Sequence, residues 1–353
     1  MSTKVAQFEQ TISKDHPVYK PEKGRYWLYI SAGCPFAQRT WITRAVKNLT
    51  SVIGVTVVHW KLKDLSWKLV PGDASQLGDM AYTIDGGMIS SKYDSSTLLG
   101  DKLNDDNEVP FVDGTVDPNY GITSIQQLYD MMTDVEYTDT HEFPILWDLK
   151  TRTIVNNNWN QIPGILNSAF ANFPETQGTI DLVPTSVAKE IKEFNEWLSP
   201  HINFAVYEVG LATEQGIYEK NLVQFYKDLD TVEDKLKAVY NALEKEYGSS
   251  NQEDILKKFF LFNGQLTECD IRLYATIIRF DPVYAVHFKL NWRTIRGDYG
   301  YIHLWLRNLY WNHKEFSATT NFDHMKLLYF RSQLEANPNG LVLYGPEKNI
   351  LEL

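Results

Sequence analysis

The chain divides into a first part where strand and helix patterns alternate and a second part where helical patterns dominate. Residues 25–30 form an aromatic and β-branched run, which predicts a β-strand. Residues 34–49 place apolar side chains on one face at helical spacing, with Pro35 in the first turn, where its missing N–H costs nothing. A second strand is expected within 52–60. The order of these elements predicts a βαβ unit.

Two further strand-like runs, at 143–147 and 153–155, are separated by a polar turn and predict an antiparallel hairpin. A helix is expected to begin near Asn157 or Asn158, because asparagine is a good N-cap residue, and to continue to Phe170. A Pro-Gly pair weakens the middle of this helix. The first part of the chain is therefore expected to be an α/β domain.

The second part of the chain shows almost no strand patterns. Residues 217–247 repeat apolar positions every three or four residues, which predicts one long amphipathic helix closed by a glycine. A second helix is expected at 266–280, with Thr267 as N-cap and Asp270 three residues later, a variant of the capping box. A third is expected at 301–310. This part is therefore predicted to be an all-α domain.

The segments between these elements suggest how the chain is organised. Polar stretches rich in proline and glycine mark an arm at the start and a linker between the two parts. A long irregular stretch in the first part is interpreted as a functional insertion or a lid. The expected order is an arm at 1–24, a first domain at 25–171 with an insertion at about 61–138, a linker at 172–185, a helical domain at 186–330 and a tail at 331–353.

Composition narrows the class of protein. The 353 residues suggest about two domains, and 13% aromatic residues can fill two cores. The formal net charge of −11 argues against a nucleic-acid-binding protein, which needs clustered basic residues. Neither a secretory signal nor an apolar run long enough for a membrane span is found. Two cysteines exclude a disulfide framework, so a reducing, cytoplasmic setting is expected.

The most informative residue is Cys34, which lies where the first strand turns into a helix. Backbone N–H groups and the helix dipole favour a thiolate there, so the pKa of Cys34 is expected to fall and its nucleophilicity to rise. Ala37 stands where a C-x-x-C pair would have its second cysteine, so the site is monothiol and can form a mixed disulfide only with another molecule. From position alone, a buried structural cysteine is an equal alternative.

Several segments together resemble one family. The chain is similar to the cytosolic glutathione transferases, and more narrowly to the omega-like glutathione transferases of fungi and the glutathionyl-hydroquinone reductases (Xi class). The resemblance spans almost the whole chain and implies a thioredoxin-like N-terminal domain followed by an all-α domain. The matching segments are Lys-Pro-Glu-Lys-Gly-Arg-Tyr at 20–26, Cys-Pro-Phe-Ala-Gln-Arg at 34–39, Pro-Ile-Leu-Trp-Asp at 144–148, Thr-Ile-Val-Asn-Asn at 153–157 and Leu-Thr-Glu-Cys-Asp-Ile-Arg-Leu-Tyr at 266–274.

The resemblance implies roles for residues of the first domain. Cys34 matches the cysteine that attacks the glutathione sulfur of a glutathionyl conjugate, forming a mixed disulfide that a second glutathione releases. Pro144 matches a cis proline, so that Phe143, where the family usually has valine, offers its backbone N–H and C=O to the cysteinyl part of glutathione. Trp67 matches a tryptophan beside the glutathione.

In the helical domain, Tyr207 and Tyr284 match tyrosines near the pocket for the second substrate. A tyrosine hydroxyl there donates a hydrogen bond to a quinol or carbonyl oxygen and stabilises developing negative charge. Without the resemblance, packing in the core is the expected role of any one tyrosine. His287, which lies nearby in the sequence, is interpreted as a hydrogen-bonded structural histidine.

One departure from the family pattern affects glutathione binding. Where the family has Glu-Ser-Ser, of which the Glu and the first Ser bind the γ-glutamyl end, this chain has Asn158, Trp159 and Asn160. Losing the Glu removes the negative partner of the ammonium group, which contributes about 1.5–3 kcal/mol, or roughly tenfold to a hundredfold in affinity. Asn158 can still accept one hydrogen bond from the ammonium group. The glutathione site is therefore expected to be weakened or reshaped.

The residues and the resemblance leave three functions open. The first is a cysteine-type glutathione transferase that uses glutathione as co-substrate and reduces glutathionyl conjugates, mixed disulfides or small oxidants. The second is a diverged binding or regulatory protein with weak or no glutathione activity. The third, conjugation of glutathione to electrophiles, usually needs a Ser or Tyr donor to the glutathione thiolate. The expected partners are glutathione and a small electrophilic or aromatic substrate, within a cytoplasmic homodimer that binds no nucleic acid, membrane or metal.

Overall fold

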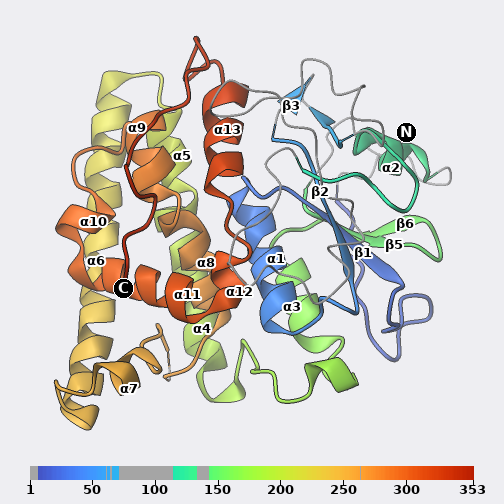
Figure 1. The fold of residues 1–353 in the computed structure, drawn as a ribbon, viewed down its shortest axis with the longest axis horizontal. Coiled ribbons are helices and arrows are strands. Elements are labelled where there is room, and N and C mark those ends of the chain that lie inside the picture. The colour runs from blue at the N-terminus through green and yellow to red at the C-terminus, as the bar shows by residue number, and fades with distance from the viewer. Residues whose placement is uncertain (1–6, 61, 64–65, 71–113, 133–142, 263) are drawn as a thin grey trace. The chain divides into compact units, whose positions relative to one another are not determined.

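The computed structural model describes residues 7–60, 62–63, 66–70, 114–132, 143–262 and 264–353. The chain folds into two compact units. The first unit comprises Met1–Thr179 and Ala318–Ser332, and the second comprises Ile180–Ser317 and Gln333–Leu353 (Figure 1). The boundary after Thr179 falls within the linker expected at 172–185. The sequence pattern alone assigned 318–330 to the helical domain, whereas the structure places this segment in the first unit.

A four-stranded mixed sheet forms the centre of the first unit. Its strands are β1 (Tyr26–Ile30), β2 (Gly54–Val57), β5 (Ile145–Asp148) and β6 (Thr153–Asn156), in the order β2-β1-β5-β6. β1 is parallel to β2 and antiparallel to β5, and β5 is antiparallel to β6. Nearly every strand residue is buried, as expected for a sheet covered on both faces. The predicted βαβ unit and hairpin are confirmed.

The helix predicted at 34–49 is α1 (Pro35–Val46), with Cys34 as its N-cap. It ends earlier than expected because Asn48 takes a positive φ of 53°, which a continuing helix does not allow. α1 lies beside α3 (Ile162–Ser168) against the sheet (Figure 1). The packing of these two helices places the start of α1 next to the loop that precedes α3.

The prediction that a helix begins near Asn157 or Asn158 is wrong, because α3 begins at Ile162. The carbonyl of Asn158 accepts hydrogen bonds from the N–H groups of Gln161 and Ile162, so a turn precedes the helix. Pro163 lies in the first turn of α3, where its missing N–H has no partner to lose. The Pro-Gly pair therefore marks the start of the helix and not a weak middle.

Most of the insertion expected at 61–138 lies outside the described residues, and its role as a lid stays a prediction. The described parts include a two-stranded sheet of β3 (Leu62–Lys63) and β4 (Ser66–Trp67), and the short helix α2 (Gln126–Asp130). At 114 the chain runs against β2. Gly114 takes a φ of 95°, and a Cβ there would come within 2.6 Å of the Val57 carbonyl oxygen, so only glycine fits.

The segment expected to be a surface arm instead extends the sheet beyond β6. Glu9 forms an isolated antiparallel bridge with Asn156, and the Gln10 N–H donates to the Val155 carbonyl at 3.0 Å. Ile12 is only 3% exposed and belongs to the core of the first unit. The described part of the arm is therefore held by backbone pairing and by apolar packing.

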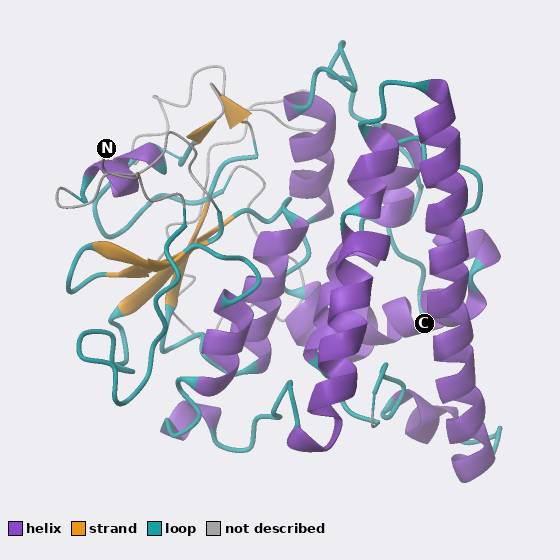
Figure 2. Ribbon diagram, turned by 180° about the vertical axis from the view of Figure 1, so that it is seen from behind, coloured by secondary structure: helices purple, strands orange, loops and turns teal. Residues whose placement is uncertain are grey.

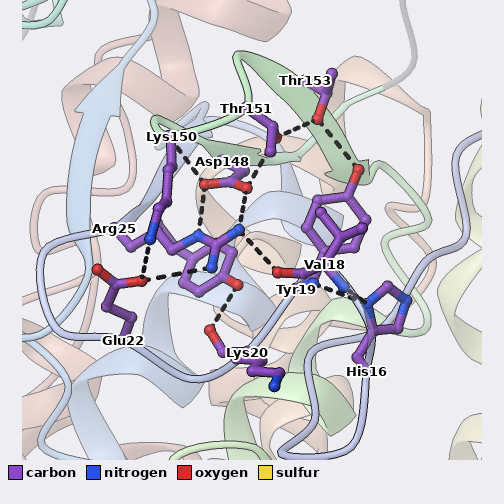
Figure 3. A network of polar contacts seen from close by, with 11 residues as sticks. His16, Val18, Tyr19, Lys20, Glu22, Arg25, Asp148, Lys150, Thr151 and Thr153 are labelled. Atoms are coloured by element: carbon purple, nitrogen blue, oxygen red, sulfur yellow. Dashed lines mark hydrogen bonds and ion pairs between the residues drawn. The ribbon is translucent and has the colours of Figure 1, made fainter.

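A polar network anchors the second half of the arm to the β5–β6 hairpin (Figure 3). The Arg25 guanidinium donates two hydrogen bonds to the buried Asp148 carboxylate, at 2.9 and 2.7 Å, and a third to the Val18 carbonyl. The Tyr19 hydroxyl lies 3.1 Å from the Thr153 hydroxyl. Burial alone would raise the pKa of Asp148, but hydrogen bonds, chiefly from Arg25, hold it below its usual value.

In the part of the second unit that the structure describes, helices predominate and no strand is assigned (Figure 2). No helix among the described residues is both long and apolar enough to cross a membrane. The α-helices are α4 (Ala188–Leu198), α5 (Ala205–Gly210), α6 (Gln215–Tyr247), α7 (Gln252–Leu256), α8 (Glu268–Ile277), α9 (Ala285–His287), α10 (Ile295–Asp298), α11 (Gly300–Asn312) and α12 (Lys314–Ser317). One further helix of the second half of the chain, α13 (Phe322–Ser332), belongs to the first unit.

The long helix and the capping box predicted from the sequence are both confirmed. α6 ends at Tyr247, and its C-cap residue Gly248 has a φ of 85°. Both the N–H and the hydroxyl of Thr267 donate to the Asp270 carboxylate, at 3.0 and 2.9 Å, at the start of α8. α8 ends earlier than predicted, and a π-helical turn at Phe280–Tyr284 follows it.

Candidate active site

Cys34 occupies the N-cap position of the 12-residue helix α1, as predicted. Its backbone is extended, with φ −79° and ψ 124°, and its carbonyl accepts the hydrogen bond from the Gln38 N–H that opens the helix. The side chain is half-buried and packs against the core of the first unit. The structure thus places a partly exposed thiol at the positive end of a helix dipole.

The segment Ala318–Ser332, which was not expected in this unit, packs against the turn that carries Cys34. A Cβ on Gly33 would lie 2.5 Å from the Cδ2 atom of Leu328 and 3.2 Å from the His324 ring. The Gln38 side-chain amide donates to the Thr319 carbonyl at 2.9 Å. These contacts connect the start of α1 to a segment almost 300 residues away in the chain. No local pattern in the sequence indicated them.

The second cysteine, Cys269, differs from Cys34 in its burial. Cys269 is fully buried on α8, and its thiol donates a weak hydrogen bond to the Ile191 carbonyl at 3.6 Å. Burial raises the pKa of Cys269 well above its usual value. Neither cysteine forms a disulfide. Only Cys34 therefore combines exposure with a position that favours the thiolate.

Trp67 and Phe143, both predicted to line the glutathione site, stack on each other. Their ring centroids are 5.0 Å apart and their planes differ by 21°. The Phe143–Pro144 peptide bond is cis, as the resemblance implied. Phe143 is almost fully buried, whereas Trp67 is half-buried. The large side chain at 143 thus packs against Trp67.

Trp159 packs on the first turn of the cysteine helix. Its ring centroid lies 4.7 Å from that of Phe36, and the Arg39 guanidinium lies over both rings, 5.3 Å from Trp159 and 5.0 Å from Phe36. Arg39 is 1% exposed, so the two rings help to cover a buried cation. The bulky residue at 159 therefore has a packing role that the sequence did not indicate.

Besides the two hydrogen bonds that its carbonyl accepts, Asn158 takes part in three others. Its N–H donates to the Asn156 side-chain oxygen at 2.8 Å, and its own side-chain oxygen accepts from the Asn160 N–H at 2.9 Å. Its side-chain nitrogen donates to the Glu9 carboxylate at 2.7 Å. The oxygen that was expected to accept from a ligand ammonium group thus already has one donor. The sequence did not indicate that the arm brings an acid to this position.

In the second unit, Tyr207 and Tyr284 lie together, as the resemblance implied. Their ring centroids are 6.3 Å apart in an edge-to-face arrangement, and the Phe288 ring contacts both. Tyr284 is fully buried, whereas Tyr207 is half-buried. Phe288 packs so closely on Gly210 that a Cβ there would lie 2.2 Å from its ring. His287 is hydrogen-bonded to Gln333 at 2.8 Å, as a structural histidine would be.

A mixed four-stranded sheet covered by helices and followed by a helical unit is the fold of the glutathione transferases. A family model described as the C-terminal domain of glutathione S-transferase matches residues 215–308. The chain is 45% identical to glutathione S-transferase omega-like 2 of Saccharomyces cerevisiae, over 99% of this chain and 96% of the relative. It is 31% identical to the Escherichia coli glutathionyl-hydroquinone reductase YqjG, over 94% of this chain and 82% of the reductase.

Solved structures agree. The Xi glutathione transferase ECM4 of S. cerevisiae, crystallised in complex with glutathione, superimposes with a TM-score of 0.84 at 44% identity, over 99% of this chain and all of that one. The Xi glutathione transferase of Phanerochaete chrysosporium gives a TM-score of 0.76 at 34% identity, with full coverage of both chains. The chain belongs to the glutathione transferase family, among the omega-like and glutathionyl-hydroquinone reductase members.

Proposed function

We propose that this enzyme uses glutathione as co-substrate and reduces glutathionyl conjugates, such as glutathionyl-hydroquinones, through a mixed disulfide on Cys34. The observation that supports the proposal most is the half-buried thiol at the N-cap of a 12-residue helix. The first backbone N–H groups of a helix are not used by the helix's own hydrogen bonds, and their dipoles stabilise a thiolate. The thiolate is the form of cysteine that attacks sulfur.

The proposed reaction balances in two steps. In the first, the Cys34 thiolate attacks the glutathione sulfur of the conjugate. A sulfur–sulfur bond forms, the carbon–sulfur bond breaks, and the aromatic carbon leaves with the electron pair and takes up a proton. In the second step, the thiolate of a second glutathione attacks the mixed disulfide. Glutathione disulfide leaves, and Cys34 returns to its thiolate. The conjugate is reduced and two glutathione units are oxidised.

We further propose that the stacked pair of Trp67 and Phe143 and the segment around Asn158 and Trp159 contact the bound glutathione. This proposal rests on the resemblance, and all four residues belong to the first unit. Tyr207, the half-buried member of the tyrosine pair, is proposed to donate a hydrogen bond to the oxygen of the aromatic substrate, with Tyr284 and Phe288 holding its ring in place.

Conjugation of glutathione to electrophiles is less well supported, because a cysteine at this helix tip favours disulfide chemistry. A diverged binding protein is the second candidate. The packing of Trp159 on Phe36 and the engaged oxygen of Asn158 both favour it. Calorimetric titration distinguishes the two functions. Lack of binding at millimolar glutathione would support the diverged protein.

The test of the mechanism is Cys34→Ser, which should abolish reduction of a glutathionyl-hydroquinone and leave the thermal unfolding temperature unchanged. Cys269→Ala is the matched control and should retain turnover, because Cys269 is sealed from solvent. Unchanged turnover in Cys34→Ser would refute the mechanism. We also propose a homodimer located in the cytoplasm, which light scattering and cell fractionation would test.

A further inference from the structure

We propose that Glu9, on the N-terminal arm, supplies the negative charge that binds the α-ammonium group of the γ-glutamyl end of glutathione. The inference rests on the proposed function, since it requires that glutathione binds with this end near Asn158. It assigns a substrate-binding role to the arm, which the sequence pattern alone indicated to be a solvated surface segment. Glu9 and Asn158 are separated by almost 150 residues in the chain.

Backbone hydrogen bonds on both sides hold Glu9 in place. On one side, the Phe8 N–H donates to the Asn157 side-chain oxygen at 2.8 Å, and the Asn157 N–H donates to the Phe8 carbonyl at 3.0 Å. On the other side, the Gln10 N–H donates to the Val155 carbonyl at 3.0 Å. Because the residues before and after Glu9 are paired to the sheet edge, the backbone position of Glu9 is defined and does not resemble that of a free chain end.

The Glu9 carboxylate is itself held by two amide donors. Its Oε1 atom accepts from the Asn158 side-chain nitrogen at 2.7 Å and from the Gln161 side-chain nitrogen at 3.1 Å. The orientation of the Asn158 amide is not arbitrary, because its oxygen must accept from the Asn160 N–H. Its nitrogen must therefore face Glu9. Asn158 acts as the donor that positions a carboxylate carried by another segment.

Two features make this carboxylate suitable for an ammonium group. Both of its hydrogen bonds fall on Oε1, and Oε2 has no hydrogen-bond partner among the residues that the structure describes. Glu9 is exposed, so a ligand can reach it. A carboxylate that accepts amide hydrogen bonds on one oxygen and an ammonium hydrogen bond on the other has donors for both of its oxygens. The acid that is missing at 158 would thus be replaced in space by Glu9.

The charge pattern supports the same conclusion. An acid at position 158 would lie within hydrogen-bond distance of the Glu9 carboxylate, and two ionised carboxylates at that distance repel each other. A neutral amide at 158 removes the repulsion and adds an attraction. Glu9 and Asn158 therefore fit together as one site: Glu9 supplies the single carboxylate, and the Asn158 amide orients it by a hydrogen bond.

The first experiment compares two ligands. Glutathione and its analogue with a glutaryl group in place of the γ-glutamyl group, which lacks the ammonium, are titrated into the wild-type protein and into Glu9→Gln. The variant should bind glutathione about fivefold to tenfold more weakly, the low end for a charge-assisted hydrogen bond because Glu9 is exposed. Its affinity for the analogue should stay within about twofold of the wild type.

The matched control is Glu175→Gln, which removes an acid of the same unit that pairs with Lys23. It should leave both affinities unchanged. Unchanged glutathione affinity in Glu9→Gln, or an equal loss for both ligands, would overturn the role of Glu9 while leaving the proposed function intact. No glutathione binding to the wild type itself would instead overturn the proposed function, and the role of Glu9 with it. The two failures are therefore distinguishable.

The second experiment moves the carboxylate. Asn158→Glu in the wild-type background should lower glutathione affinity, because it places a second acid against Glu9 and removes the amide donor. The same substitution in Glu9→Gln should restore the affinity that Glu9→Gln lost. In this double variant the donor and the acid have exchanged positions, so the introduced amide can donate to the introduced acid and a single carboxylate is present. If Asn158→Glu has the same effect in both backgrounds, the two positions do not share one ammonium group and the inference is wrong.

Discussion

Gly33 lies so close to Leu328 that a Cβ atom on the glycine would stand 2.5 Å from the leucine Cδ2 and 2.9 Å from its Cβ. The second distance matters more, because the Leu328 Cβ belongs to the start of its side chain and cannot rotate away. Any larger residue at 33 must therefore move α13 or the turn before Cys34. The close approach couples the turn before Cys34 to a helix from the far end of the sequence.

Gly33→Ala should destabilise the protein by about 1–3 kcal/mol, the usual cost of overpacking a filled interior. Turnover should fall as well, since the strain falls on the residue next to Cys34. Urea unfolding and steady-state kinetics are the measurements. Gly164→Ala is the matched control, because a Cβ there meets nothing within 4 Å in α3. That control should be neutral or stabilising by about 0.5–1 kcal/mol. Equal stability of Gly33→Ala and the wild type would contradict the coupling.

Alkylation with iodoacetamide at neutral pH should label the folded protein once, at Cys34. Cys269 has no exposed surface, and burial raises its pKa, so its sulfur stays a protonated thiol. Intact-mass measurement followed by peptide mapping gives the site. Labelling in denaturant should reach both cysteines and serves as the control. Rapid labelling of Cys269 in the folded protein would show that α8 opens more readily than its burial implies.

Trp159→Ser should lower the free energy of unfolding by about 2–3 kcal/mol. The substitution removes the ring contact with Phe36 and one of the two rings over the buried Arg39 guanidinium. Trp159→Phe keeps an aromatic ring, so its free energy of unfolding should fall by less than half of that amount. Chemical denaturation of both variants tests the order. A serine variant as stable as the wild type would mean that Trp159 is retained for a ligand and not for packing.

The Arg25–Asp148 pair should make the stability of the protein depend on acid pH. The folded-state pKa of Asp148 is lowered, so the stability that it contributes is complete above its unfolded pKa of about 3.9 and is lost as the pH falls through the folded value. Asp148→Asn should cost about 3 kcal/mol at pH 7, the low end for breaking a buried ion pair, because Arg25 loses its buried counter-ion and keeps Glu22 at 3.4 Å. It should also flatten the dependence of stability on pH below about 4. Thermal unfolding between pH 2 and 7 tests both expectations. If the stability of Asp148→Asn falls with acid pH as steeply as that of the wild type, groups other than Asp148 cause the loss of stability in acid.

Local chemistry was predictable from the sequence. Cys34 at a helix N-cap, the capping box of Thr267 and Asp270, and the long helix α6 all depend on residues within one or two turns of each other. Spacing and capping preferences therefore identify them without knowledge of the fold. The start of α3 was placed wrongly because two asparagines offered good caps, whereas the position of Pro163 in the first turn decided the boundary.

Residue patterns alone specify the strand–helix–strand order, the helical second half and the position of Cys34 at a helix tip. The long-range contacts become visible only in the folded chain: α13 packs on Gly33, Trp159 and Phe36 cover Arg39, and Glu9 contacts Asn158. The reason is physical. Periodicity records which side of an element is apolar, but it contains no information about which distant segment covers that side. Partners more than a hundred residues apart are selected by shape and charge complementarity, which exist only once the chain has folded.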